Sequence, residues 1–258
     1  MIRRYAEMRP EELAAALAER PLAICPWGAL EWHGAHLPLG LDGLVAEAFS
    51  ERLAEATGGV LLPGTWLPIT ALPHAHSISI PTATVCAVWR ALFDELARVG
   101  FKTICLVTGH YAQGHELELY RECREAITRH EDLRVIAASP LELLLAPDLL
   151  DHAGRKETAQ LLAVRPELVR MDLFEEGGPG VNAVLGDDPR QATAEEGEQL
   201  LGDAVLAWES ALDLWDRATV WEFYGRRMKE YRPYRNEFYR ESWEQAIRDW
   251  WAARSGDR

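Results

Sequence analysis

Short apolar runs alternate with longer segments of helical periodicity through the first half of the chain. Apolar runs at residues 21–25, 60–69, 102–108 and 133–139 predict strands, and prolines interrupt the second of them. Between the runs, apolar residues recur three or four positions apart, which predicts amphipathic helices. The predicted helices span residues 9–20, 43–59, 85–101 and 114–130.

Near-continuous apolar strands separated by helices are typical of a mainly parallel sheet that is covered on both faces. We therefore predict an α/β fold. In such sheets, ligands usually bind beyond the carboxyl ends of the strands. Two loops that contain histidine, 28–42 and 109–115, follow predicted strands and are expected at this edge.

The pattern weakens after residue 165. A loop rich in Gly, Pro and acidic residues precedes a long amphipathic helix at residues 193–215, which begins with Thr193 as cap and Glu196 three positions on. Six of the ten tryptophans occur from Trp208 onward. We find no repeat or linker, and we predict a single domain, 1–258, with a helical Trp-rich C-terminal extension from about 193. Its tryptophans are interpreted as core or as contacts with a neighbouring chain.

The composition of the chain limits the classes of partner that it can bind. The chain has 258 residues, 48% hydrophobic and 26% charged, as in ordinary globular proteins. Its net charge of −14 argues against nucleic acid, because phosphate binding requires a basic face. The four cysteines have no CxxC spacing, and Cys25 and Cys105 fall in predicted strands, so buried thiols are expected. No secretory or membrane-spanning segment is recognised, and a cytoplasmic location is expected.

Residues 28–43 gather four potential metal ligands, Glu31, His33, His36 and Asp42. Residues two apart on an extended segment point to the same side, so Glu31 and His33 can face one metal ion. The alternative makes Asp42 a helix cap and the histidines hydrogen-bonding loop residues.

Two later clusters carry similar side chains. His110 follows a predicted strand and is expected at the same edge as Glu31. His115 and Glu116 lie one turn into the next helix, where a solvated face is expected. His152 precedes a helix whose first turn contains Glu157. Glu157 is either a metal ligand or an acidic first-turn residue that interacts favourably with the helix dipole.

Charge counting favours two metal ions. Glu31, Asp42 and Glu157 supply three negative charges, which together with one hydroxide balance two divalent cations. A shared carboxylate between two ions is typical of dinuclear hydrolytic sites. His74 and His76, in a proline-rich loop, are interpreted as incidental. The chain contains no GxGxxG, Walker A or GxSxG motif, so nucleotide-binding and serine-hydrolase functions have no support.

Three stretches resemble sequence blocks of the creatininase (creatinine amidohydrolase) family. They are "GALEWHGAHLPLGLD", "GFKTICLVTGHY" and "HAGRKETA", which occur in the family's order and span residues 28–159. The resemblance implies a three-layer α/β/α sandwich with a mainly parallel central sheet. It also implies a homo-oligomer, commonly a hexamer in this family.

The resemblance further implies a set of metal ligands. These are Glu31, His33, Asp42, His110 and Glu157, and Asp42 would bridge two ions.

Two more positions match family residues near the substrate. His152 matches a histidine beside the substrate, suited to polarising a carbonyl or transferring a proton, and we group it with Glu157 as catalytic. Tyr111 matches the aromatic residue that follows Gly-His in creatininase itself, and with His152 it is expected to contact substrate.

The chain departs from the family pattern at three positions. Thr108 replaces the usual Asn before Gly-His, Ala112 replaces a glutamate that serves one metal in creatininase, and Asp148 replaces a tryptophan. These departures argue against creatinine as the substrate.

We therefore expect a metal-dependent amidohydrolase that cleaves a non-peptide C–N bond, in a cyclic amide or formamide, by a water activated at two divalent ions. Mixed imidazole and carboxylate ligands suit Zn²⁺, with Mn²⁺ or Fe²⁺ as alternatives. Other enzymatic readings are creatininase proper, a formamidopyrimidine-type deformylase and a small-peptide hydrolase of the peptide-cofactor maturation type. A non-catalytic binding or assembly subunit, and an unrelated hydrolase with one structural metal, remain open.

Overall fold

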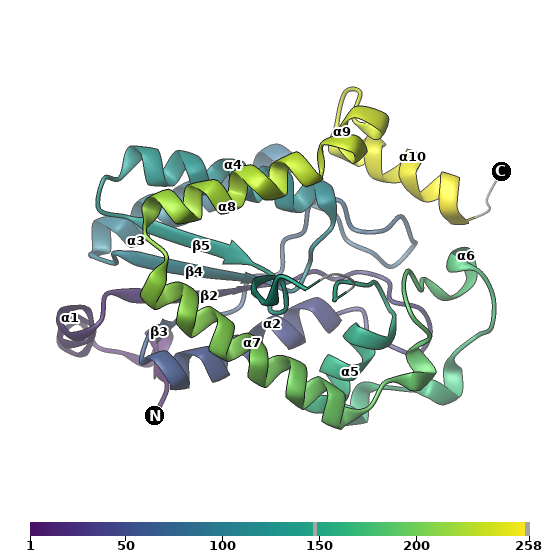
Figure 1. Ribbon diagram of the computed structural model, residues 1–258, viewed down its shortest axis with the longest axis horizontal. Coiled ribbons are helices and arrows are strands. Elements are labelled where there is room, and N and C mark those ends of the chain that lie inside the picture. The colour runs from purple at the N-terminus through teal and green to yellow at the C-terminus, as the bar shows by residue number, and fades with distance from the viewer. Residues whose placement is uncertain (147–148, 256–258) are drawn as a thin grey trace.

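A five-stranded parallel sheet forms the centre of the molecule in a computed structural model that describes residues 1–146 and 149–255 (Figure 1). Position 148 lies outside the described residues. The strand order is β1-β3-β2-β4-β5, and every pairing of these strands is parallel. The strands are β1 (Arg3–Arg4), β2 (Leu22–Trp27), β3 (Val60–Leu61), β4 (Thr103–Thr108) and β5 (Arg134–Ala138). The mainly parallel sheet is confirmed, although sequence patterning missed the short β1.

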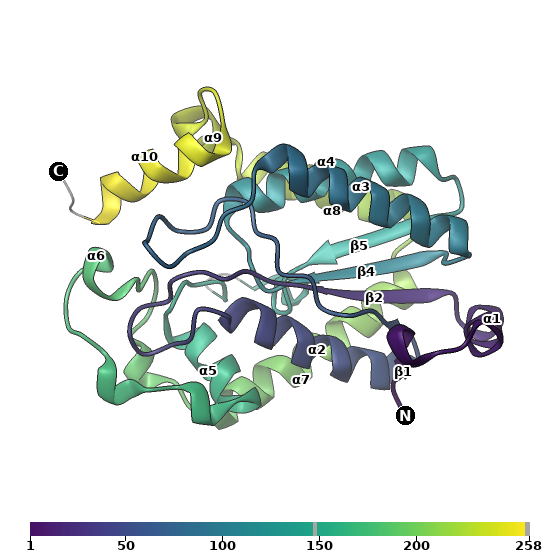
Figure 2. The ribbon, with the colours of Figure 1, turned by 180° about the vertical axis from the view of Figure 1, so that it is seen from behind.

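Helices cover both faces of the sheet and make three layers (Figures 1 and 2). One outer layer contains α2 (Leu41–Thr57), α5 (Arg155–Val164) and α7 (Ala194–Leu214). The other contains α3 (Thr82–Val99), α4 (Gln113–Arg129) and α8 (Arg217–Glu230). The predicted α/β/α sandwich is therefore confirmed. Buried Cys25 and Cys105 lie in the sheet as free thiols, as expected.

The predicted helix ends coincide with local capping geometry. Gly58 and Gly100 follow α2 and α3 with φ angles of +71° and +118°, a left-handed backbone that glycine adopts without a steric penalty. Thr193 accepts a hydrogen bond from the backbone N–H of Glu196 at 3.1 Å, which caps α7. These ends were predictable because capping depends on neighbouring residues.

Short helical segments complete the chain. They are α1 (Pro10–Glu19), α6 (Pro179–Asn182), α9 (Arg232–Phe238), α10 (Trp243–Ser255), η1 (Tyr5–Glu7), η2 (Glu142–Leu144), η3 (Pro166–Leu168), η4 (Met171–Leu173) and η5 (Pro189–Gln191). Within the tail, Trp208, Trp243 and Trp251 are buried inside the chain, which confirms the core interpretation for them. None of the helices in the described residues is both long enough and apolar enough to span a bilayer.

The sheet topology creates an opening at the carboxyl ends of β2 and β4. These neighbouring strands end level with each other, because Trp27 pairs with Thr108. From β2 the chain continues to α2 on one face, and from β4 it continues to α4 on the opposite face. Connections that diverge in this way leave a crevice between two adjacent strands. The loops 28–42 and 109–115 both line this edge.

Candidate metal centre

The amino end of α2 packs directly against the two strand ends. A Cβ atom on Gly109 would lie 2.0 Å from the backbone oxygen of Asp42, and one on Gly28 would lie 2.3 Å from Cα of Gly43. Only glycine permits this approach of backbone to backbone. The contact places Asp42, the second residue of α2, between the loops that follow β2 and β4.

The two histidines of these loops each expose one ring nitrogen to the centre. His33 donates from Nδ1 to the backbone oxygen of Glu31 at 3.0 Å, and His110 donates from Nε2 to the backbone oxygen of Ile69 at 2.9 Å. A carbonyl can only accept, so the proton sits on the bonded nitrogen. Nε2 of His33 and Nδ1 of His110 are therefore the nitrogens that face the centre, the arrangement found in metal-ligating histidines.

Asp42 lies between the two imidazoles. Its Oδ1 is 3.1 Å from Nε2 of His33, and its Oδ2 is 3.3 Å from Nδ1 of His110. Both oxygens and the His33 nitrogen are buried without a hydrogen-bond partner among the described residues. Buried polar atoms are normally paired, so these three atoms, whose close contacts are with one another, His110 and Glu157, are available to bind a further group.

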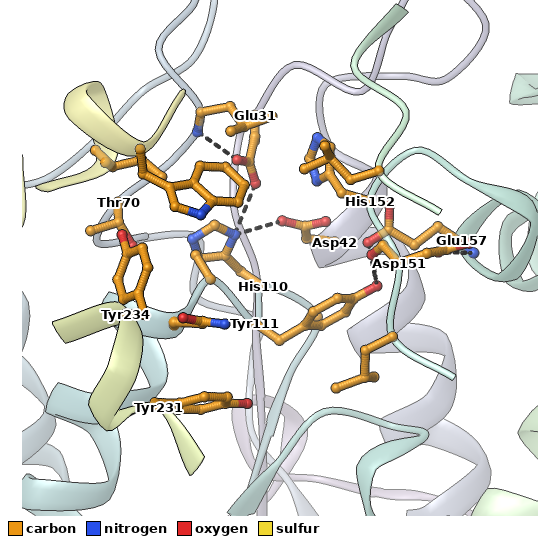
Figure 3. Close-up of a pocket in the computed structure, with 18 of the residues that line it drawn as sticks. Glu31, Asp42, Thr70, His110, Tyr111, Asp151, His152, Glu157, Tyr231 and Tyr234 are labelled. Carbon is orange, nitrogen blue, oxygen red and sulfur yellow. Dashed lines mark hydrogen bonds and ion pairs between the residues drawn. The ribbon is translucent and has the colours of Figure 1, made fainter. Parts of the chain in front are cut away.

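Glu31 and Glu157 hold the outer sides of the centre (Figure 3). Glu31 accepts from the backbone N–H of Leu72 at 2.5 Å, and its other oxygen lies 2.9 Å from Nδ1 of His110. Glu157 accepts from the backbone N–H of Ala153 at 2.6 Å, and the same oxygen lies 3.5 Å from Nε2 of His33.

Three ligand groups result, each with its atoms within 4.8 Å of one another. They are Glu31 with Asp42 and His110, His33 with Asp42 and Glu157, and Glu31 with His33 and His152. Asp42 belongs to the first two groups. The structure thus brings together the five side chains that the sequence singled out.

Buried charges perturb the protonation of this cluster. Burial alone would lower the pKa of His33, but the carboxylates of Asp42 and Glu157 outweigh it and raise that pKa to about 10. Burial raises the pKa of Glu157 to about 8. These shifts show that protons and a divalent cation would compete for the same positions between the carboxylates and the imidazoles.

The donor set fits divalent metal ions. It combines oriented imidazole nitrogens with carboxylates, offers orphaned buried atoms on both sides of Asp42, and draws its residues from three separate segments. Imidazole and carboxylate ligands of this kind suit Zn²⁺, Mn²⁺ or Fe²⁺.

His152 lies against the centre rather than within the Asp42 groups. Its ring stacks on His33 with centroids 4.3 Å apart, and its Nε2 donates to the backbone oxygen of Trp32 at 3.0 Å. Burial lowers the pKa of His152 to about 4, so the ring is neutral and Nδ1 is free to accept a proton.

Tyr111 connects the predicted substrate side to Glu157. Its hydroxyl lies 2.5 Å from Oε1 of Glu157 and 2.8 Å from the backbone oxygen of Asp151. The sequence had suggested no role for Asp151. Its carboxylate accepts from the N–H groups of Lys156 and Glu157 and thereby fixes the first turn of α5.

The solvated face expected for His115 and Glu116 is wrong, whereas His36 follows the alternative of a hydrogen-bonding loop residue. His115 and Glu116 are fully buried, because α4 is covered by both α3 and α8. His115 accepts from the N–H of Ile69 and so supports the segment that orients His110. His36, a potential ligand, instead donates to the backbone oxygen of Ala153 at 3.1 Å and takes no part in a described ligand group.

A pocket of about 320 Å³ opens onto the ligand groups. His74 and His76 do not line it among the described residues. Its far wall comes from the C-terminal tail, whose tryptophans the sequence had led us to interpret as core or as contacts with a neighbouring chain. These tail residues are Arg227, Tyr231, Tyr234, Ile247 and Trp250. No local motif marks them, because their role depends on how α8, α9 and α10 fold back.

Comparison with known proteins identifies relatives. The sequence model of the family described as "Creatininase: Creatinine amidohydrolase" matches residues 6–212. The creatinine amidohydrolase of Pseudomonas putida is 29% identical over 173 residues, which are 57% of this chain and 65% of that protein. The chain thus spans just under two thirds of that relative. The mycofactocin precursor peptide peptidase of Mycolicibacterium smegmatis is 28% identical over 76% of this chain and 85% of its own.

Solved structures show the same fold. A crystal structure of creatinine amidohydrolase (creatininase) superposes with a TM-score of 0.73 at 22% identity, over 82% of this chain and 98% of that one. Another match, with a TM-score of 0.73 at 22% identity over 83% of this chain and 99% of its own, is described as "Creatininase Mn". A third, described as a Zn-Zn type creatininase mutant, has a TM-score of 0.71 at 22% identity and covers 81% and 97%.

Proposed function

This chain belongs to the creatininase family, and we propose that it is a metal-dependent amidohydrolase that cleaves a non-peptide C–N bond in a small cyclic amide or formamide. The observation that carries the proposal is the position of Asp42 between His33 and His110, with both carboxylate oxygens buried and unpartnered among the described residues.

In this proposal, Asp42 would serve two divalent ions. Glu31 and His110 would hold one of them, and His33 and Glu157 would hold the other. Such ions, when bound, activate a water for attack and stabilise negative charge on the amide oxygen. Zn²⁺ is favoured, with Mn²⁺ and Fe²⁺ as alternatives, and relatives of this fold described as Zn-Zn and Mn forms support the choice.

A side chain of the protein transfers the proton from the attacking water to the leaving nitrogen. Nδ1 of His152 accepts a proton from the attacking water as the new C–O bond forms, and returns it to the amide nitrogen as the C–N bond breaks. The lone pair on Nδ1 can take the proton, and the lowered pKa of this partly buried ring favours its rapid return. Tyr111 holds Glu157 in place through its hydroxyl and lines the substrate pocket.

A second candidate is a small-peptide hydrolase. The mycofactocin precursor peptide peptidases favour this candidate. Their alignments cover 76% of this chain, whereas the alignment with creatinine amidohydrolase covers 57%. The departures Thr108 and Ala112 argue against creatinine itself. A cytoplasmic location, a single domain and a homo-oligomer, hexameric by family resemblance, stay predictions.

The test combines metal analysis with a substrate panel. Purified protein is stripped, reloaded with Zn²⁺ or Mn²⁺, and assayed on creatinine, cyclic amides, formamides and dipeptides. We expect hydrolysis of a cyclic amide or formamide, lost together with metal in Glu31→Ala and His110→Ala. His130→Ala, on a histidine paired with Asp94 away from the pocket, is the matched control. Full activity of His110→Ala would refute the site, and dipeptide cleavage alone would favour the second candidate.

A further inference from the structure

The C-terminal tail forms the pocket wall that faces the candidate metal centre. Tyr231 lies between α8 and α9, Tyr234 lies on α9, and Ile247 and Trp250 lie on α10, yet all four line the same pocket as Glu31 and His110. Figure 3 shows Tyr231 and Tyr234 across the pocket from Asp151 and Glu157. The family model ends at residue 212, so this wall lies outside the matched region.

The wall is fixed to the body of the protein. Trp243 donates from its indole N–H to Glu118 of α4 at 2.6 Å, and Glu244 accepts from the N–H and hydroxyl of Thr82 at the start of α3. Below α9, the hydroxyl of Tyr231 donates to buried Glu116 at 2.5 Å. Side chains held at both ends in this way present a preformed surface to a ligand.

The surface presented is aromatic and aliphatic. Tyr234 and Ile247 are each at least nine-tenths buried, and Trp250 packs against the Tyr234 ring in an edge-to-face arrangement. Leu150 and Leu185 continue the apolar lining. Flat aromatic groups gain both burial and ring contacts on such walls.

The pocket offers no free positive side chain to an anionic substituent. Arg227 is the one guanidinium or ammonium group among the described lining residues. Its Nε donates to Glu142 at 2.5 Å, its Nη1 donates to Glu230 at 2.5 Å, and its Nη2 donates to the hydroxyl of Tyr231. Each nitrogen of Arg227 already donates to a protein group, and Glu142 and Glu230 balance its charge, so a carboxylate placed on this wall would lose its hydration for little electrostatic gain.

We propose that this tail wall, defined as Tyr234, Ile247 and Trp250, selects amides that carry an uncharged aromatic substituent, which stacks on the wall while the amide faces the metal centre. The inference rests on the proposed amidohydrolase function and names its substrate class. The pocket volume of about 320 Å³ accommodates a single aromatic ring together with its amide.

The test measures binding and turnover of three related amides by the metal-loaded full chain. N-methylformamide, formanilide and 4-carboxyformanilide differ in the presence of a ring and of a charge. We expect formanilide to have the lowest Kd by calorimetry, at least about tenfold below that of the carboxylated compound. Trp250→Ala should raise the Kd and KM of formanilide about tenfold and leave N-methylformamide nearly unchanged.

Trp221→Ala is the matched control, because Trp221 lies in the same tail, packs on Arg124 and does not line this pocket. Metal content is measured in every variant to show that the centre is intact. Binding in the expected order without hydrolysis would support the wall and refute the amidohydrolase. The wall's role would be overturned if Trp250→Ala lost affinity equally for all three amides. It would also be overturned if the carboxylated compound bound more tightly than formanilide.

Discussion

His33 and Asp42 face each other within the buried centre, with Nε2 of the imidazole 3.1 Å from Oδ1 of the carboxylate. The other oxygen of Asp42 faces His110. One carboxylate therefore belongs to both halves of the proposed dinuclear site, and this makes the consequences of substitution unequal.

Replacing Asp42 should empty both halves, whereas replacing Glu157 should empty one. Asp42→Ala removes a ligand from two of the ligand groups, and Glu157→Ala leaves the group of Glu31, Asp42 and His110 intact. We expect metal content to fall from about two ions per chain to near zero in the first variant and to about one in the second. Elemental analysis after dialysis measures this. Equal metal loss in the two variants would contradict the bridging position.

Tyr111→Phe should weaken metal binding without removing a ligand. The hydroxyl of Tyr111 lies 2.5 Å from Oε1 of Glu157, and groups that orient a ligand typically change metal affinity tenfold or more. We expect the Kd of the more weakly held ion to rise about tenfold, measured by competition with a chromogenic chelator. Tyr5→Phe, on a ring that packs against Phe101 far from the centre, should leave the Kd unchanged. An unaltered Kd in Tyr111→Phe would show that Glu157 needs no such support.

Two glycine substitutions should change stability in opposite directions. A Cβ on Gly109 would lie 2.0 Å from the backbone oxygen of Asp42, so Gly109→Ala forces β4 and α2 apart and should cost about 3 kcal/mol of unfolding free energy. Gly202 lies within α7, and apart from the nearby backbone of that helix no atom of a described residue lies within 4 Å of such a Cβ. Gly202→Ala should stabilise by about 0.5–1 kcal/mol, because alanine favours helix. Urea unfolding distinguishes them, and a tolerated Gly109→Ala would disprove the tight approach.

The stability of the protein should depend on pH through Glu116. Burial, reinforced by the nearby Glu142, raises the pKa of Glu116 well above its usual value of 4.5. The folded state then keeps a proton that the unfolded chain has lost, so this group lowers stability as pH rises above 4.5. Glu116→Gln removes the effect, and its stability relative to the wild type should increase between pH 5 and pH 8 in urea unfolding.

Glu142→Gln, in the hydrogen-bond network that also contains Glu116, should affect stability differently from Glu116→Gln. Glu142 accepts from Nε of Arg227, and its loss leaves that guanidinium short of a charged partner. We expect destabilisation of about 2 kcal/mol near pH 5 and a smaller destabilisation at pH 8, because the loss of the Glu142 charge also removes part of the repulsion that raises the pKa of Glu116. If Glu116→Gln and the wild type lost stability in parallel with pH, the carboxyl of Glu116 would be ionised in the folded protein.

Much of the fold and the identity of the ligands could be predicted from the sequence. Periodicity marks the helices and strands, because each element buries one face at a fixed repeat. Alternation of the two predicts a parallel sheet, and the carboxyl edge of that sheet is where chain connections leave room for a ligand. Glu31, His33 and His110 could be assigned to that edge for this reason alone.

Other features depended on contacts that no local pattern encodes. Glu116 looked like a solvated residue because the hydroxyl that buries it, from Tyr231, comes 115 positions later. Which nitrogen of His33 faces the centre depends on a backbone carbonyl that the folded loop supplies.

The sequence by itself determined the chemical types near the opening and the layers that carry them, since both follow from residue identity and short-range periodicity. Only the tertiary structure decided that Asp42 lies between two imidazoles and that Trp250 lines the pocket. Both outcomes arise from close packing between distant segments, where backbone approach and side-chain shape select one arrangement among many that share the same local pattern.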